Sequence, residues 1–143
     1  MTGRAQDLIG GVLETSVYAD DLEAARGFYG GVLGLTEIMA LKGRHVFFRC
    51  GPGVLLVFRA EATQAPHPPG ALPVPAHGAV GAGHVCLAVP EAGMEAIAAH
   101  LTAAGVAIES DFRWPSGVRS IYVRDPAGNS VEFASPRLWE MPE

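Results

Sequence analysis

Residues 12–60 and 83–136 follow the same order of elements, and this repeat constrains the fold more than any other feature of the sequence. In each half, an alternating apolar segment precedes a helical stripe of apolar residues, and three strand-like segments follow. The sequence therefore predicts two βαβββ modules, an α+β fold. Neither module can bury an adequate core alone, so the modules must pair within one chain or across a homodimer.

The first module begins with a predicted strand over residues 12–19, where Leu13, Thr15 and Val17 share one face. Asp20 is the predicted N-cap of the helix, which ends before Gly34. The three strand-like segments that follow cover 35–41, 44–50 and 53–60.

The second module repeats this order after a connector over residues 61–82, which contains five prolines. A strand is predicted over 84–90, and a helical stripe from Met94 to Leu101 is closed by Gly105. The three final strands are predicted over 106–114, 118–124 and 129–135.

The composition is that of one globular domain spanning 1–143, with 49% hydrophobic and 17% charged residues. A net charge of −5 argues against nucleic acid as a partner, and no apolar run is long enough to cross a membrane. The N-terminus lacks the apolar region of a secretory signal, so we expect a cytoplasmic protein. Cys50 and Cys86 lie in predicted strands and are expected to be buried, reduced thiols.

Three ionisable residues lie at strand positions that point away from the helices. If the apolar residues of each strand face the helix, alternation directs Glu14, His84 and Glu132 to the opposite face, where a cavity can form. Taken singly, each has an ordinary interpretation as a solvated or hydrogen-bonded side chain. Two neighbouring buried carboxylates, however, need a shared proton, a cation or a metal. A divalent metal ion (Fe, Mn, Ni, Zn or Mg) suits a Glu, His and Glu donor set.

The repeated module and three segments resemble the vicinal oxygen chelate superfamily, which includes glyoxalase I, fosfomycin-resistance transferases, extradiol dioxygenases and bleomycin-resistance proteins. The segments are DDLEAARGFYGGVLGL, GAGHVCLAV and, most specifically, RDPAGNSVEF. The resemblance implies a U-shaped mixed sheet built from paired modules around a cavity with a divalent metal. It also implies substrates that chelate the metal through neighbouring oxygens, and an oxyanion that the metal stabilises.

Carried onto this chain, the family's metal-ligand positions fall on Glu14, His84 and Glu132, and a carboxylate freed from the metal, such as Glu132, would move the proton. The fourth ligand position, a Glu in glyoxalase I, is assigned to Val57, which cannot bind metal. This difference argues against true glyoxalase I chemistry. Glu in place of His at position 14 also departs from the two-His, one-carboxylate set of the dioxygenases.

Further polar residues share the parity of the predicted cavity face. His45 and Arg49 in the first module, and their counterparts Tyr122 and Arg124 in the second, are candidate substrate-binding residues. Ion pairs at the surface are the alternative for the arginines. His77 in the connector is either a loop histidine or a group that closes over the site.

Three hypotheses follow for a chain whose partner is a small molecule. The first is a metal-dependent enzyme with lyase, isomerase, ring-cleaving or transferase chemistry. The second is a metal-free binding protein of the bleomycin-resistance type, with a cavity lined by Phe47, Tyr122 and Trp114. The third is a structural subunit that keeps the fold without chemistry.

Overall fold

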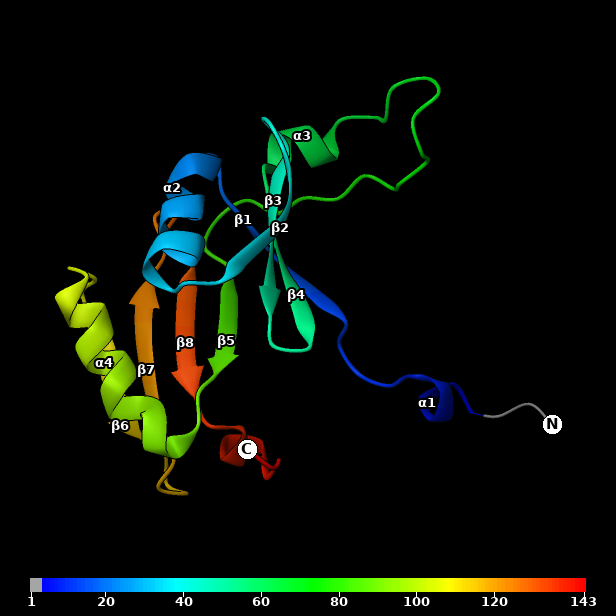
Figure 1. Ribbon diagram of the computed structural model, residues 1–143. Helices are drawn as coiled ribbons and strands as arrows, with labels where there is room; N and C mark the ends of the chain where they lie inside the picture. Colours follow the sequence, from blue (N-terminus) through cyan, green and yellow to red (C-terminus); the bar gives the residue numbers. More distant parts are fainter. Residues whose placement is uncertain (1–3) are drawn as a thin grey trace.

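The computed structural model describes residues 4–143, which form two four-stranded mixed sheets (Figure 1). The strands of the first sheet are β1 (Glu14–Tyr18), β2 (Thr36–Leu41), β3 (His45–Cys50) and β4 (Gly53–Phe58). Those of the second are β5 (His84–Ala88), β6 (Ser110–Arg113), β7 (Arg119–Arg124) and β8 (Ser130–Ala134). The strand orders are β1-β4-β3-β2 and β5-β8-β7-β6, with β1 parallel to β4, β5 parallel to β8, and the other neighbours antiparallel. This identical topology confirms the predicted α+β fold of two βαβββ modules.

The first module's helix has two parts, α2 (Leu22–Arg26) and the π-helical η1 (Gly27–Val32). Its N-cap is Asp21, whose side chain accepts a hydrogen bond from the Ala24 N–H at 2.9 Å, so the prediction of Asp20 was wrong by one residue. Three glycines lie in the π-helical part. Because glycine has low helix propensity, these turns depart readily from α geometry.

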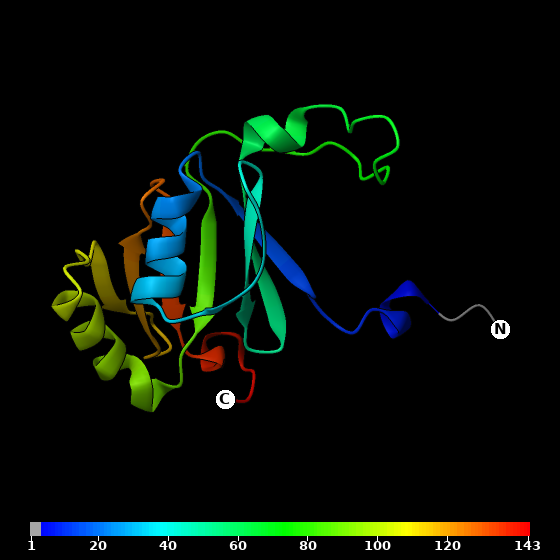
Figure 2. The same ribbon diagram turned by 45° about the horizontal axis from the view of Figure 1, so that its top comes forward.

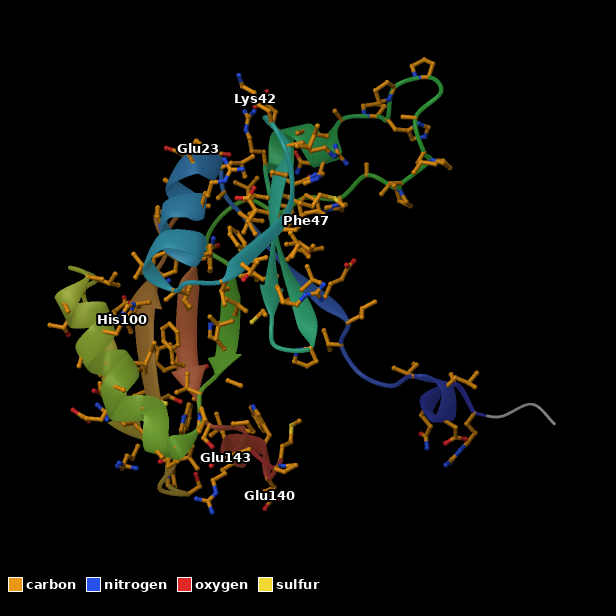
Figure 3. All side chains as sticks on the ribbon, in the orientation of Figure 1. Glu23, Lys42, Phe47, His100, Glu140 and Glu143 are labelled. Carbon is orange, nitrogen blue, oxygen red and sulfur yellow. The ribbon has the colours of Figure 1, made fainter. Side chains whose placement is uncertain are left out.

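The second module's helix, α4 (Met94–Ala103), follows the short 3-10 turn η2 (Glu91–Gly93). It buries Met94, Ala98 and Leu101, as the helical stripe predicted, and Gly105 follows with a φ of 77°. His100 on α4 (Figure 3) donates from Nε2 to the carbonyl oxygen of Val32 at 2.6 Å, which ties this helix to η1.

Short helices that the sequence pattern did not predict occur outside the repeat. They are α1 (Ala5–Leu8), α3 (Ala60–Gln64) and the 3-10 turn η3 (Pro136–Trp139). Helix α3 occupies the start of the predicted connector, which extends beyond the end of the first sheet, away from α4 (Figure 2). His77 secures the connector, because its Nδ1 lies 2.7 Å from the Tyr18 hydroxyl and its ring packs against Phe58. Within 4–143, no helix is both long and apolar enough to cross a bilayer.

Both modules contribute to one hydrophobic core on the helix side of the sheets. Its fully buried members include Tyr29 and Val57 from the first module and Leu101, Ile121 and Val131 from the second. Burial of this shared apolar surface is the main force that holds the two modules together.

A buried polar network crosses between the modules at the turn after β7. The Tyr29 hydroxyl donates to Asp125 Oδ2 at 2.8 Å, and Asn129 Nδ2 donates both to that oxygen and to the carbonyl oxygen of Tyr18. Asp125 Oδ1 accepts the N–H groups of Ala127 and Asn129. Burial and the Asp125 carboxylate hold the pKa of Tyr29 far above its usual range, so the hydroxyl stays a donor.

We expect Tyr29→Phe to lower the free energy of unfolding by about 1.5–3 kcal/mol, because it removes a buried hydrogen bond to a carboxylate. Urea denaturation measures the change. Tyr18→Phe is the matched control: its hydroxyl is only partly buried and contacts an imidazole nitrogen rather than a carboxylate, so a loss of about 1 kcal/mol or less is expected. Equal losses in the two variants would contradict a special role for the Tyr29–Asp125 contact.

Candidate functional site

His84 and Glu132 lie together on the face of the second sheet opposite the helices. They come from the adjacent parallel strands β5 and β8, whose register pairs His84 with Ser130 and Cys86 with Glu132. His84 Nε2 is 3.3 Å from Glu132 Oε2. The imidazole is half exposed, whereas the carboxylate side chain is only 7% exposed. Strand parity therefore identified the face of both residues correctly.

Hydroxyl groups orient both members of this pair from behind. Ser130 Oγ lies 3.0 Å from His84 Nδ1, and the Ser120 hydroxyl donates to Glu132 Oε1 at 2.6 Å. The serines thus hold His84 through Nδ1 and Glu132 through Oε1, which leaves Nε2 and Oε2 facing each other. An imidazole nitrogen and a carboxylate oxygen in this arrangement can bind a divalent cation or exchange a proton.

Glu14 does not join His84 and Glu132 within the chain. It is exposed at the start of β1 and, with Cys86, borders a small hollow of about 120 Å³ where the two sheets meet. Between residues 4 and 143, no three His, Cys, Asp or Glu side chains are close enough together to hold a metal ion. A single chain brings together two of the three predicted ligands.

The register of the first sheet corrects the assignment of the fourth position. Val57 pairs with Val17 and is fully buried in the core, so it points to the helix side. Leu56, which pairs with Ser16, occupies the position in β4 that Glu132 occupies in β8. The sequence alignment of the two halves was displaced by one residue, which reverses the face of a strand. Leu56 is apolar too, so the absence of a fourth carboxylate stands.

Aromatic rings extend the candidate site across the second sheet. The Tyr122 ring stacks on His84 at 6.2 Å and on Phe112 at 5.9 Å, and Phe112 contacts Trp114 edge-on at 4.9 Å. Burial, followed by the effect of Glu132, raises the pKa of Tyr122 to about 12, so this hydroxyl is protonated at neutral pH. The result is a row of aromatic rings beside the His84–Glu132 pair.

The first sheet carries its own aromatic group on the face away from α2. His45 stacks on Phe47 at 4.1 Å, and both rings pack against Phe58; Phe47 is labelled in Figure 3. Burial, and secondarily Arg44, lowers the pKa of His45, which favours the neutral imidazole. Arg49 is exposed at the same parity. His45 and Arg49 therefore share a face, as predicted, but they lie on the first sheet and His84 on the second.

Arg124 is engaged elsewhere. Its guanidinium pairs with Glu109, with Nε to Oε2 at 2.7 Å, and Nη1 donates to the carbonyl oxygen of Gly128. These contacts occur at the exposed surface, where such a pair stabilises weakly. Arg124 therefore forms a surface ion pair, which was the alternative to substrate binding. Tyr122, in contrast, lies beside His84 at the candidate site.

The two cysteines differ from the sequence expectation in burial. Both are free thiols, but Cys50 is half-buried and Cys86 is exposed on the face that carries Glu132. Burial of the sulfur and the neighbouring Glu132 raise the pKa of Cys86 to about 12, so it remains a neutral thiol. The expectation of buried thiols was wrong because this face of β5 lacks a covering layer.

Sequence reasoning missed Ser120 as a functional residue. It is fully buried in β7 and bonds directly to Glu132. A signal was present, because Ser120 has the same strand parity as Tyr122, but serine at an alternating position is too common to be distinctive. Its importance appears only once β7 is paired with β8.

Comparisons with known proteins extend over nearly the whole chain. A family model described as the Glyoxalase/Bleomycin resistance protein/Dioxygenase superfamily matches residues 11–133. The lactoylglutathione lyase from Agrobacterium tumefaciens is 40% identical, with 93% of this chain and 98% of that chain covered and a TM-score of 0.89. No curated protein matches significantly.

More distant solved structures share the fold at lower identity. A glyoxalase/dioxygenase from Nostoc punctiforme is 21% identical, with 100% of this chain and 99% of that chain covered and a TM-score of 0.67. A virulence protein from Salmonella typhimurium is also 21% identical, with 89% and 97% covered and a TM-score of 0.64. The family match includes both sheets and the residues Glu14, His84 and Glu132. The chain belongs to the Glyoxalase/Bleomycin resistance protein/Dioxygenase superfamily.

Proposed function

We propose that this protein is a divalent-metal-dependent vicinal oxygen chelate enzyme that acts on a small molecule with neighbouring oxygen donors. The observation that carries the proposal is the His84–Glu132 pair, with 3.3 Å between Nε2 and Oε2 and each side chain oriented by a serine hydroxyl. Metal ligands in proteins are commonly held in this way by groups behind them. The 40% identical relative, named a lactoylglutathione lyase, supports a glyoxalase-like reaction, while Leu56 at the fourth ligand position argues for a metal site that differs from that of glyoxalase I.

The donor atoms fit a divalent cation such as Mn, Fe, Ni, Zn or Mg. His84 and Glu132 supply one nitrogen and one oxygen on an open face, and Glu14 supplies a further carboxylate. Such a metal would polarise a substrate carbonyl and stabilise an oxyanion. With Leu56 in place of a fourth carboxylate, coordination positions are left for the substrate's oxygens. Glu132, held on one oxygen by Ser120, is the proposed proton carrier.

We also propose that the protein is a homodimer in which Glu14 of the partner subunit completes the metal site. The separation of Glu14 from the His84–Glu132 pair in one chain supports this arrangement. The aromatic faces of both sheets are uncovered in the monomer, and pairing a first sheet with a second sheet from another copy would close a cavity between them. His45 and Arg49 would then face the substrate from the opposite wall.

We expect the purified wild-type protein to bind about one divalent ion per chain, and His84→Ala to lower the affinity at least about tenfold because it removes a direct ligand. Calorimetric titration with Mn²⁺, Ni²⁺ and Zn²⁺ measures this. His67→Ala, in the exposed connector, is the control and should bind as wild type. If neither the wild type nor the control binds any of the three ions, the metal-dependent function is wrong.

Mixed dimers test the shared site. Glu14→Ala and His84→Ala each damage every site in a homodimer, but a mixed dimer regains one intact site if Glu14 and His84 act across subunits. Random re-pairing should restore about a quarter of the wild-type metal sites, since about half of the dimers are mixed and each has one intact site. Co-refolded variants titrated with Mn²⁺ give the number. No restoration, with mixing verified by mass spectrometry, would place all ligands in one chain.

A metal-free binding protein is the second candidate, favoured by the stacked rings of His45 with Phe47 and of Phe112 with Tyr122. Parallel rings of this kind bind planar ligands without a metal. Titration with bleomycin in the presence and absence of a chelator separates the candidates. Binding that is indifferent both to the chelator and to His84→Ala favours the binding protein.

A further inference from the structure

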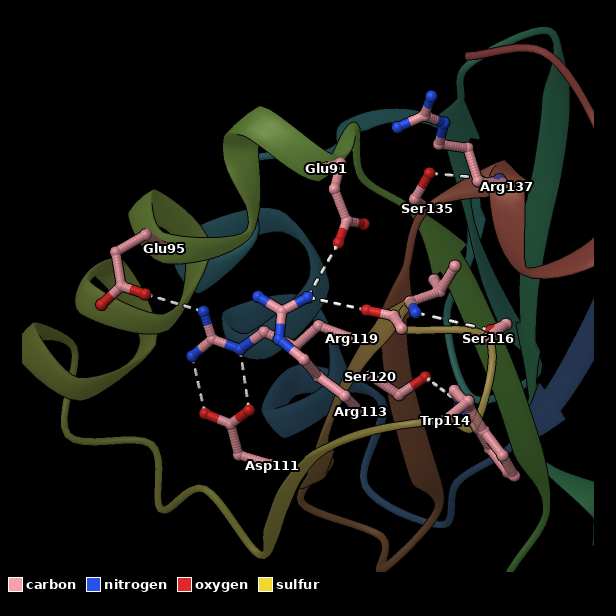
Figure 4. A network of polar contacts seen from close by, with 12 residues as sticks. Glu91, Glu95, Asp111, Arg113, Trp114, Ser116, Arg119, Ser120, Ser135 and Arg137 are labelled. Carbon is pink, nitrogen blue, oxygen red and sulfur yellow. Dashed lines mark hydrogen bonds and ion pairs between the residues drawn. The ribbon is translucent and has the colours of Figure 1, made fainter.

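Ser120 lies at the centre of a short hydrogen-bond chain behind the candidate metal site. Its side chain is fully buried, and its hydroxyl donates to Glu132 Oε1 at 2.6 Å. The same hydroxyl oxygen accepts a hydrogen bond from Trp114 Nε1 at 2.8 Å, drawn as a dashed line in Figure 4. Trp114 in the turn after β6, Ser120 in β7 and Glu132 in β8 are thus connected.

The direction of both hydrogen bonds is fixed by chemistry. An indole N–H can only donate, so Trp114 must occupy a lone pair of the serine oxygen. The lone pairs of Glu132 Oε1 lie 2.6 Å from the serine oxygen, so the single hydroxyl hydrogen of Ser120 points to Glu132. Without Trp114 the hydroxyl would be free to rotate; with it, donation to Glu132 is the arrangement that satisfies all three groups.

Trp114, the outer member of this hydrogen-bond chain, is held in place by its surroundings. Trp114 belongs to the tight turn between β6 and β7, where its N–H donates to the carbonyl oxygen of Val118 and its own carbonyl accepts from Gly117. Its ring also packs edge-on against Phe112. Arg113, the preceding residue, bonds to the Gly117 carbonyl oxygen and to Glu91 (Figure 4). The turn therefore provides a fixed support for the indole.

We propose that Ser120 is a positioning residue that holds Glu132 through Oε1 so that Oε2 faces His84 Nε2, and that Trp114 sets the direction of the Ser120 hydroxyl. This inference rests on the proposed metal-dependent function, because Oε2 is the atom offered to the metal. Glu132 is 6% exposed, so water has little access to its carboxylate, and the Ser120 hydroxyl is the donor in contact with Oε1. Because the hydrogen bond to Oε1 already restricts the carboxylate, metal binding costs less side-chain conformational entropy.

We expect Ser120→Ala to weaken Mn²⁺ binding by about 10- to 100-fold, the usual effect of removing a group that orients a metal ligand. Ser116→Ala, in the exposed turn next to Trp114, is the matched control and should bind like wild type. Ser120→Thr keeps the hydroxyl and adds a methyl group in a buried position. Its Mn²⁺ affinity should therefore stay near the wild-type value even if its melting temperature falls.

Two measurements test the proposed role of Trp114 in the hydrogen-bond chain. Trp114→Phe should weaken Mn²⁺ binding less than Ser120→Ala does, and in the double variant it should add nothing, because both act through one hydrogen bond. Trp139→Phe leaves Trp114 as the single tryptophan. In this variant Mn²⁺ binding should change the fluorescence of Trp114, and adding Ser120→Ala should abolish that change.

The outcomes separate this inference from the function on which it rests. If wild type and Ser120→Ala bind Mn²⁺ equally, the positioning role is wrong and the metal-dependent function stands. If Ser120→Thr loses as much affinity as Ser120→Ala, Ser120 contributes packing rather than a directed hydrogen bond, and the inference is overturned. If wild type binds no Mn²⁺, Ni²⁺ or Zn²⁺, both the function and the inference fail.

Discussion

The buried carboxylate of Asp125 fixes how the two modules sit against each other. It accepts hydrogen bonds from Tyr29 in the first module and from Asn129 in the second, and Asn129 reaches back to the backbone of Tyr18. A hydrophobic core alone tolerates sliding between packed layers, because apolar contacts have no direction. A buried polar group that loses its partners is costly, so the network favours the relative position of the modules in which all of these hydrogen bonds form.

This fixed position determines which surfaces remain for chemistry. With η1 and α4 joined on the helix side, as in the contact between His100 and Val32, the opposite faces of both sheets stay uncovered. The second sheet then presents His84 and Glu132 as neighbours, while the first presents Glu14 too far away to join them. The homodimer proposed above would bring these separated residues together.

Much of the fold followed from periodicity, and the errors have physical causes. Strand parity placed His84, Glu132 and Tyr122 correctly because their strands alternate between polar and apolar residues. It failed at Val57, because the run from Val54 to Phe58 is apolar at every position and gives no signal of register. How the two modules pack was beyond prediction for a different reason: the contacts that decide it, such as that between Tyr29 and Asp125, join residues 96 positions apart.

The segment from Asp125 to Glu132 shows why structure and chemistry are hard to separate in this fold. Asp125 and Asn129 turn the chain and lock the modules, and the next residues, Ser130 and Glu132, orient and supply the candidate ligands. Because alternate residues of a strand share a face, the residue that enters β8 at the turn sets the facing of every side chain after it. The network around Asp125 therefore fixes the direction in which Glu132 points as well as the packing of the two modules. Ser120 refines that direction from the neighbouring strand, by holding one carboxylate oxygen and leaving the other toward His84.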